Sequence, residues 1–244
     1  MPGALKKPRW DGLRQGRYSR YILYGLGEVF LIFIGITLAV ALENSAEQRR
    51  EAALTSGLLS GVVQDLEANI IDLRRNRSSD SLYIASIDRV VAHLESSEEW
   101  NDSIGSVLRT ALRWSSPYLS TAGYEGLKQA GLHRVPDADV RRRIINLFEN
   151  SYGLLVGDVD RAIWTYVEAV VMPLVHTELV RSDSGSDENA GFRPKSLTAT
   201  RARDDLRSAF LEQRDLILGG ATVRESALAE TETLLSTIDV LASR

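Results

Sequence analysis

The stretch that decides the fold is Tyr21–Leu42, which reads YILYGLGEVFLIFIGITLAVAL. Thirteen of its 22 residues are Leu, Ile, Val or Phe, and Glu28 is its one charged residue. As an α-helix, a segment of this length spans roughly 33 Å, about the hydrocarbon thickness of a bilayer. The aliphatic and Phe side chains favour insertion by about 4 to 8 kcal/mol, whereas Glu28 opposes it by about 3 kcal/mol at most. The segment is therefore predicted to be a transmembrane helix.

Two other interpretations of this segment stay open. Ala39-Val40-Ala41 has the small-x-small pattern of a signal-peptide cleavage site, although the apolar run exceeds the usual length of about 7–15 residues. A buried core helix of a soluble protein is the second alternative. Such a helix seldom contains an uncharged run as long as Val29–Leu42 next to a basic flank. The transmembrane helix is the interpretation that we carry forward.

The charges on either side of the span predict its orientation. Six basic residues precede it, whereas Arg49 and Arg50 are the basic residues within twenty positions after it. Because positive charge is retained on the cytoplasmic side, residues 1–20 are predicted to be cytoplasmic and residues 43–244 to lie across the membrane. In a bacterium this is the inner membrane, with a periplasmic domain. The expected interface anchors are Arg17, Tyr18, Arg20, Tyr21 and Tyr24.

Four residues of the span predict contact with another membrane helix: Gly27, Glu28, Gly35 and Ala39. Small residues allow close backbone approach, and an ionisable side chain inside a span is a candidate functional group. Glu28 also has a simpler interpretation, because it lies near the end of the span and can reach the interface or Tyr24. The sequence favours this interfacial account and leaves the functional one open.

The composition excludes several classes of function. The chain has a net charge of −4, of which residues 1–42 contribute +4 and residues 43–244 contribute −8. An acidic main domain does not match a nucleic-acid binder, which needs a basic surface to neutralise phosphates. The chain contains no cysteine, so it has no disulfides, thiolate nucleophiles or cysteine-ligated metals.

The run Tyr21-x-x-Tyr24-Gly-x-Gly-Glu-x-x-Leu-x-x-x-Gly35-Ile resembles the start of an uncharacterised family of bacterial single-span membrane proteins. Those proteins typically read Y-x-x-Y-A-x-G-E-x-x-L-x-x-x-G-I, followed by an Asn and a Glu–Arg pair. Tyr124–Gly131 (YEGLKQAG) is similar to the Y-E-A-L-K-x-S-G of the same family. This chain departs from the pattern at its Gly25 and in Ala41–Leu42. The family carries a domain of unknown function, so the resemblance implies topology and transfers no chemistry.

Apolar residues recur at steps of three and four through most of the remaining chain, which predicts an all-α bundle of five to seven helices. No period-2 strand is predicted. Gly219-Gly220 is expected to separate two helices of a C-terminal hairpin within 200–242, and 181–196 has the composition of a mobile loop. The expected helices are 43–77 (after which 78–80 is a turn), 82–94, 104–114, 121–130, 136–170, 200–218 and 222–242.

No catalytic, cofactor-binding or metal-binding pattern is present. His93, His133 and His176 are isolated in sequence and match no metal-ligand spacing. The large aromatic residues of the domain are either core or candidates for a protein-binding surface: Trp100, Trp114, Tyr118, Tyr124 and Trp164.

These observations predict a membrane-anchored, non-catalytic accessory or structural subunit. Its expected partners are the lipid bilayer and the subunits of a larger respiratory, photosynthetic or transport complex, contacted on the periplasmic side, and a homo-oligomer is compatible with the sequence. A periplasmic ligand sensor that acts with a separate signalling protein is one alternative. An enzyme with an unrecognised site is the other.

Overall fold

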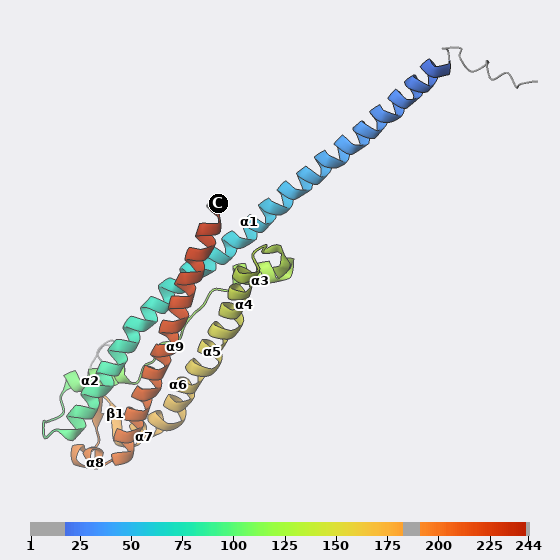
Figure 1. The fold of residues 1–244 in the computed structure, drawn as a ribbon. Coiled ribbons are helices and arrows are strands. Elements are labelled where there is room, and N and C mark those ends of the chain that lie inside the picture. The colour runs from blue at the N-terminus through green and yellow to red at the C-terminus, as the bar shows by residue number, and fades with distance from the viewer. Residues whose placement is uncertain (1–17, 183–190, 243–244) are drawn as a thin grey trace, which may run out of the picture. The chain divides into compact units, whose positions relative to one another are not determined.

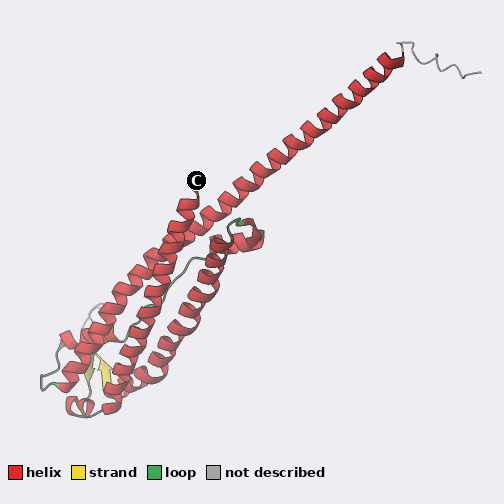
Figure 2. Cartoon of the chain, viewed as in Figure 1, coloured by secondary structure: helices red, strands yellow, loops and turns green. Residues whose placement is uncertain are grey.

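The computed structural model describes residues 18–182 and 191–242, and the side chains of 22–182 and 191–240. The chain divides into two compact units, Met1–Leu54 and Thr55–Arg244. The fold is all-α, as the sequence predicts, and it includes one small two-stranded sheet (Figure 2).

The helices are α1 (Tyr18–Glu95), α2 (Asp102–Ala111), α3 (Ala122–Ala130), α4 (Ala138–Ile145), α5 (Tyr152–Leu154), α6 (Arg161–Tyr166), α7 (Met172–Glu178), α8 (Leu197–Arg201) and α9 (Asp204–Ala242). A 3₁₀ turn, η1 (Leu132–Arg134), precedes α4. Three π-helical segments, η2 (Asn146–Ser151), η3 (Leu155–Asp160) and η4 (Val167–Val171), join α4 to α7. Strands β1 (Leu179–Arg181) and β2 (Phe192–Pro194) pair antiparallel.

The continuous helix from Ala138 to Glu178, hereafter the rod, keeps one side in the core over its whole length. Most of its buried residues recur at every fourth position within two runs, and Leu147 and Leu155 are buried outside these runs. The runs are Val140, Ile144, Phe148 and Tyr152, and then Ile163, Val167, Val171 and Val175. In an α-helix this step would drift by about 40° per repeat, because a turn takes 3.6 residues. The wider π turns absorb this drift, so the four-residue spacing explains why the rod alternates between α and π geometry.

In the second unit, the C-terminal part of α1, the rod and α9 lie side by side (Figure 1). Their apolar side chains form two core clusters. The first core cluster includes Leu66 and Leu73 of α1, Leu127 of α3, Ile144 and Leu155 of the rod, and Leu234 of α9. The second core cluster includes Ile87 of α1, Leu108 of α2, Ile163 and Val171 of the rod, and Phe210 of α9.

Charges fix the pairing of α1 with α9. Five residues of α1 form ion pairs with α9, and along α1 the first two are basic and the last three are acidic. Their partners on α9 have the opposite charges and follow in the reverse order along the chain. The pairs are Arg74–Glu232 (2.7 Å), Arg77–Glu225 (3.6 Å), Asp80–Arg224 (2.7 Å), Asp88–Arg214 (2.9 Å) and Glu95–Arg207 (3.8 Å). Each exposed pair contributes only about 0–1 kcal/mol. Their order nevertheless specifies an antiparallel arrangement, because a parallel one would place like charges together.

Two predicted interruptions are wrong. Ser78–Asp80 lies inside α1 rather than in a turn, and Gly219-Gly220 lies inside α9, so 200–242 is not a hairpin. A Cβ on Gly220 would stand 2.9 Å from Cγ1 of Val159. The absence of a side chain at Gly220 therefore allows α9 to pack closely against the rod. This packing outweighs the low helix propensity of glycine.

The predicted loop at 181–196 is wrong in part. Arg181 ends β1, and β2 occupies Phe192–Pro194, whose partner residues include Leu179 and Val180. The Trp100 indole N–H donates to the Phe192 carbonyl at 2.8 Å, which ties this sheet to the segment before α2. Residues 183–190, on which the rest of the predicted mobile loop falls, lie outside the described residues.

Candidate functional site

The apolar segment of α1 is exposed along its whole length. Every side chain from 22 to 54 is exposed, and the large apolar ones range from 44% for Ile34 to 79% for Tyr24. Within the described residues, α1 is the one helix that is long and apolar enough to cross a membrane. An exposed apolar surface of this size is unfavourable in water and favourable in lipid.

The helix brings three of the four predicted packing residues together. At 100° per residue, Glu28, Gly35 and Ala39 fall within about 40° of one another, whereas Gly27 lies about 100° from Glu28. A Cβ on Gly27 or Gly35 would meet nothing within 4 Å, so neither glycine is needed for packing inside the described chain. Of the predicted interface anchors, Arg17 and the side chains of Tyr18, Arg20 and Tyr21 lie outside the description.

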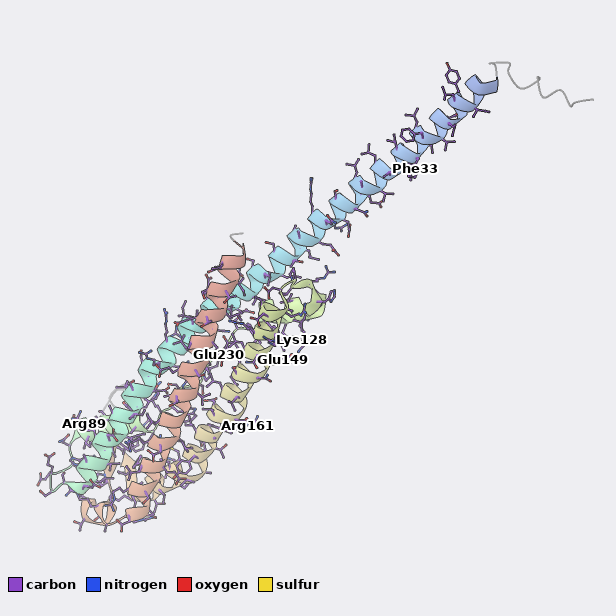
Figure 3. All side chains as sticks on the ribbon, viewed as in Figure 1. Phe33, Arg89, Lys128, Glu149, Arg161 and Glu230 are labelled. Atoms are coloured by element: carbon purple, nitrogen blue, oxygen red, sulfur yellow. The ribbon has the colours of Figure 1, made fainter. Side chains whose placement is uncertain are left out.

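The segment Tyr124–Gly131 docks α3 onto the bundle. The Tyr124 hydroxyl and the Lys128 ammonium both donate to Oε1 of Glu149 at 2.7 Å. Lys128 and Glu149 are labelled in Figure 3. Burial and then Glu149 raise the pKa of Tyr124, and the Lys128 hydrogen bond lowers the pKa of Glu149. The Tyr124 ring stacks on Phe148 with centroids 4.6 Å apart. The side chains of the Tyr124–Gly131 segment therefore serve to pack α3 against the bundle.

Two glycines allow this docking. A Cβ on Gly123 would stand 2.1 Å from the backbone of Gly61, so α3 and α1 touch through their main chains. Gly131 ends α3 with φ of 105°, a left-handed conformation that glycine adopts without strain.

Polar residues on one side of α1 hold the extended segment that leads into α3. Asn69 accepts from the Ser120 N–H at 2.6 Å and donates to its carbonyl at 3.0 Å. Asp65 accepts from the Ser120 hydroxyl at 2.5 Å and from the Tyr124 N–H at 2.9 Å. Asp72 accepts from the Tyr118 N–H at 2.9 Å. These side chains form hydrogen bonds with backbone groups of a segment that is not part of a β-sheet.

Between the two core clusters lies a buried ion pair, Asp80–Arg224. Nε of Arg224 donates to Oδ2 of Asp80 at 2.7 Å, and the side chains of Arg224 and Asp80 are 1% and 2% exposed, respectively. Oδ1 of Asp80 and both terminal nitrogens of Arg224 have no hydrogen-bond partner among the described residues. Burial raises the pKa of Asp80 in spite of the neighbouring guanidinium. Burying these two charges in an apolar interior costs desolvation free energy, which their mutual attraction offsets only in part.

Little of this arrangement fits acid–base or metal chemistry. Asp80 and Arg224 are both buried and bonded to each other, so neither side chain is accessible to an external substrate. Among the described residues, no three His, Asp or Glu side chains gather closely enough to hold a metal ion. His93 is buried against Trp100, with ring centroids 5.3 Å apart, and burial lowers its pKa.

A hollow of about 520 Å³ lies between the start of the rod and α9. Its rim includes Arg142, Arg143 and Glu230. These groups are already engaged, because both arginines pair with Asp139 and Glu230 accepts from the Ser151 hydroxyl at 2.6 Å. The charged groups on this rim are thus held by contacts within the chain, and they do not by themselves indicate a ligand.

The buried polar residues of α1 were not predicted as a set. Asp65, Asn69, Asn76 and Asp80 are buried and Asp72 is partly buried, and the five recur at steps of four, three, four and four, the spacing of one helix face. This polar series runs beside the apolar stripe of α1, and it could have been recognised as a second buried face. Arg224 carries no comparable local pattern.

No protein-family model, curated protein or solved structure matches this chain. The resemblance of the anchor to a single-span family stays a prediction.

Proposed function

We propose that this chain is a single-pass membrane protein whose helical domain serves as a non-catalytic accessory subunit of a larger membrane complex. The observation that carries the proposal is the uncovered apolar surface of α1 between Ile22 and Leu42. The charge asymmetry around that segment supports a cytoplasmic amino terminus and a domain on the opposite, periplasmic face of a bacterial inner membrane. The anchor's similarity to the single-span family described above points the same way.

The accessory role is supported by how the polar groups are used. Asp65 and Asn69 hold backbone, Asp80 and Arg224 hold each other, and Tyr124 and Lys128 share Glu149. Residues that could do chemistry thus hold the bundle together. On α1, Glu28, Gly35 and Ala39 share a face that a partner helix could approach closely.

Topology can be tested directly because the chain has no cysteine. Single cysteines are placed at Gly3 and at Ser103, and intact spheroplasts of a bacterial host are treated with a membrane-impermeant maleimide. The Ser103 variant should be labelled, and the Gly3 variant should be labelled only after lysis. The reverse pattern, or recovery of the chain in the soluble fraction, would overturn the proposed topology.

Partner binding is tested by photo-crosslinking within the membrane. A photoreactive residue at Ala39 should yield discrete protein adducts, whereas the same residue at Val40, about 100° around the helix, should react with lipid. Mass spectrometry identifies the adducts. Lipid adducts alone at both positions would contradict a helix partner on this face.

A further inference from the structure

The side of the rod that faces away from the core is unusually apolar between Gly153 and Val170, and this region is hereafter the outer face. Its large exposed side chains are Leu154 (47%), Val156 (45%), Trp164 (51%) and Val170 (37%). The solvent side of a bundle helix is ordinarily polar or charged. The outer face therefore has the composition of a surface that is covered by another molecule.

Two glycines in the outer face have no role inside the described chain. Gly153 and Gly157 are one helical turn apart, and a Cβ on either would meet nothing within 4 Å. Each glycine costs the helix about 0.5–1 kcal/mol relative to alanine. This differs from Gly123 and Gly220, where neighbouring atoms exclude a Cβ. A helix that lies against the outer face would use the missing side chains for close approach.

The charged residues of the outer face indicate which molecule binds to it. Asp158 and Arg161 are exposed one helical turn apart, and within the described part of the chain neither pairs with an oppositely charged side chain. Arg161 is labelled on the rod in Figure 3. The region has a further exposed acid, Glu168, but Asp158 and Arg161 stand one helical turn apart, and this local pair of opposite charges is complementary to the same pair on a second copy. Around a twofold axis, Asp158 of each copy can meet Arg161 of the other, which gives two equivalent ion pairs.

From these observations we infer that the outer face binds a second copy of this chain, through close packing at Gly153 and Gly157 and reciprocal Asp158–Arg161 pairs. One helix face is smaller than a standard interface of about 1,600 Å², so the dimer is expected to depend on concentration. The inference rests on the bundle alone and does not require the proposed membrane partner.

The first test is sedimentation equilibrium of the full chain in a density-matched detergent, at concentrations up to about 100 µM. The native chain should form a dimer. Gly157→Leu should raise the dissociation constant by about tenfold or more while leaving the melting temperature equal or higher, because leucine is the better helix former. Gly219→Leu is the matched control, since a Cβ on Gly219, as on Gly157, would meet nothing within 4 Å, and Gly219 is exposed on α9, away from the outer face. It should stabilise the chain without changing the dissociation constant.

The second test exchanges the charges. Asp158→Arg and Arg161→Asp should each weaken the dimer by about tenfold, because like charges then meet at both reciprocal positions. The double variant restores opposite charges and should recover dimerisation. A native chain that stays monomeric at the highest concentration would overturn the inference, and so would a dimer that Gly157→Leu leaves intact. Failure of the double exchange to recover the dimer would overturn the reciprocal pairing.

Discussion

The two units of the chain place the same kinds of apolar side chain in opposite environments. In the first unit Ile34 is 44% exposed, the lowest value among the large apolar residues of its span, whereas Ile87 in the second unit is fully buried. Polar residues differ in the same way. Glu28 is exposed without a partner helix in the described chain, whereas Asp80 is buried beside Arg224. The comparison teaches that hydropathy alone does not separate exposed apolar residues from core residues, because burial depends on the neighbours that pack against them.

The largest expected effect is in the bundle, at the buried pair. Arg224→Met should lower the free energy of unfolding by about 3–5 kcal/mol, because it leaves Asp80 buried without a counter-charge. The loss should shrink as the pH falls, since a buried carboxyl without its partner is more readily protonated. Urea unfolding of the full chain in detergent, followed by circular dichroism, measures both effects. The double variant with Asp80→Leu should recover most of the stability, and a loss equal to that of Arg224→Met alone would refute the account.

The second prediction concerns the first unit. Ile34→Arg places a charge in the middle of the span and should disfavour insertion by about 3 kcal/mol. Extraction of membranes with alkaline carbonate should then release a larger fraction of the chain, while the melting temperature of the bundle stays unchanged. Leu82→Arg is the control, because Leu82 is 57% exposed on the same helix within the second unit. Equal release of both variants would contradict the prediction that Ile34, and not Leu82, lies in the membrane-inserted segment.

The third prediction tests glycine as a packing residue. Gly123→Ala should cost about 1–3 kcal/mol of stability, because the new methyl group would stand 2.1 Å from the Gly61 backbone and α3 would have to move. Gly126→Ala, in the same helix but with open space at its Cβ, should be neutral or stabilising by up to about 1 kcal/mol. Thermal unfolding compares the two. A Gly123→Ala variant as stable as Gly126→Ala would contradict the main-chain contact.

The smallest expected effect is a pH dependence at the start of α9. The hydrogen bond from Arg203 lowers the pKa of Asp205 from 3.8 to about 2. Because the folded-state pKa is the lower one, this stabilisation is present above 3.8 and is lost as the pH falls toward 2. The contribution of Asp80 to stability changes with pH in the opposite direction, since its pKa is raised in the folded state. Asp205→Asn should therefore flatten the stability profile between pH 4 and 2. Parallel profiles for the native chain and Asp205→Asn would contradict this assignment.

Much of the helical content could be predicted from local pattern. The sequence predicts helices at 43–77 and 121–130, and the structure has the first inside α1 and the second as α3 (Ala122–Ala130). The errors fall where tertiary contacts override local preference. Gly219-Gly220 has the composition of a helix end, yet α9 continues because its contacts with the rod outweigh a propensity cost of about 1 kcal/mol per glycine.

The sequence by itself determined the apolar span, its charged flank and the all-α class, because each follows from residues close together in the chain. Only the tertiary structure decided that Asp80 pairs with Arg224, 144 positions away, and that Gly61 touches Gly123. It also decided that Trp164 is exposed while Tyr124 is buried, although both are large aromatic residues in helices. Periodicity shows that a helix has an apolar face. Which neighbour covers that face depends on contacts between distant residues, and local patterns carry no information about them.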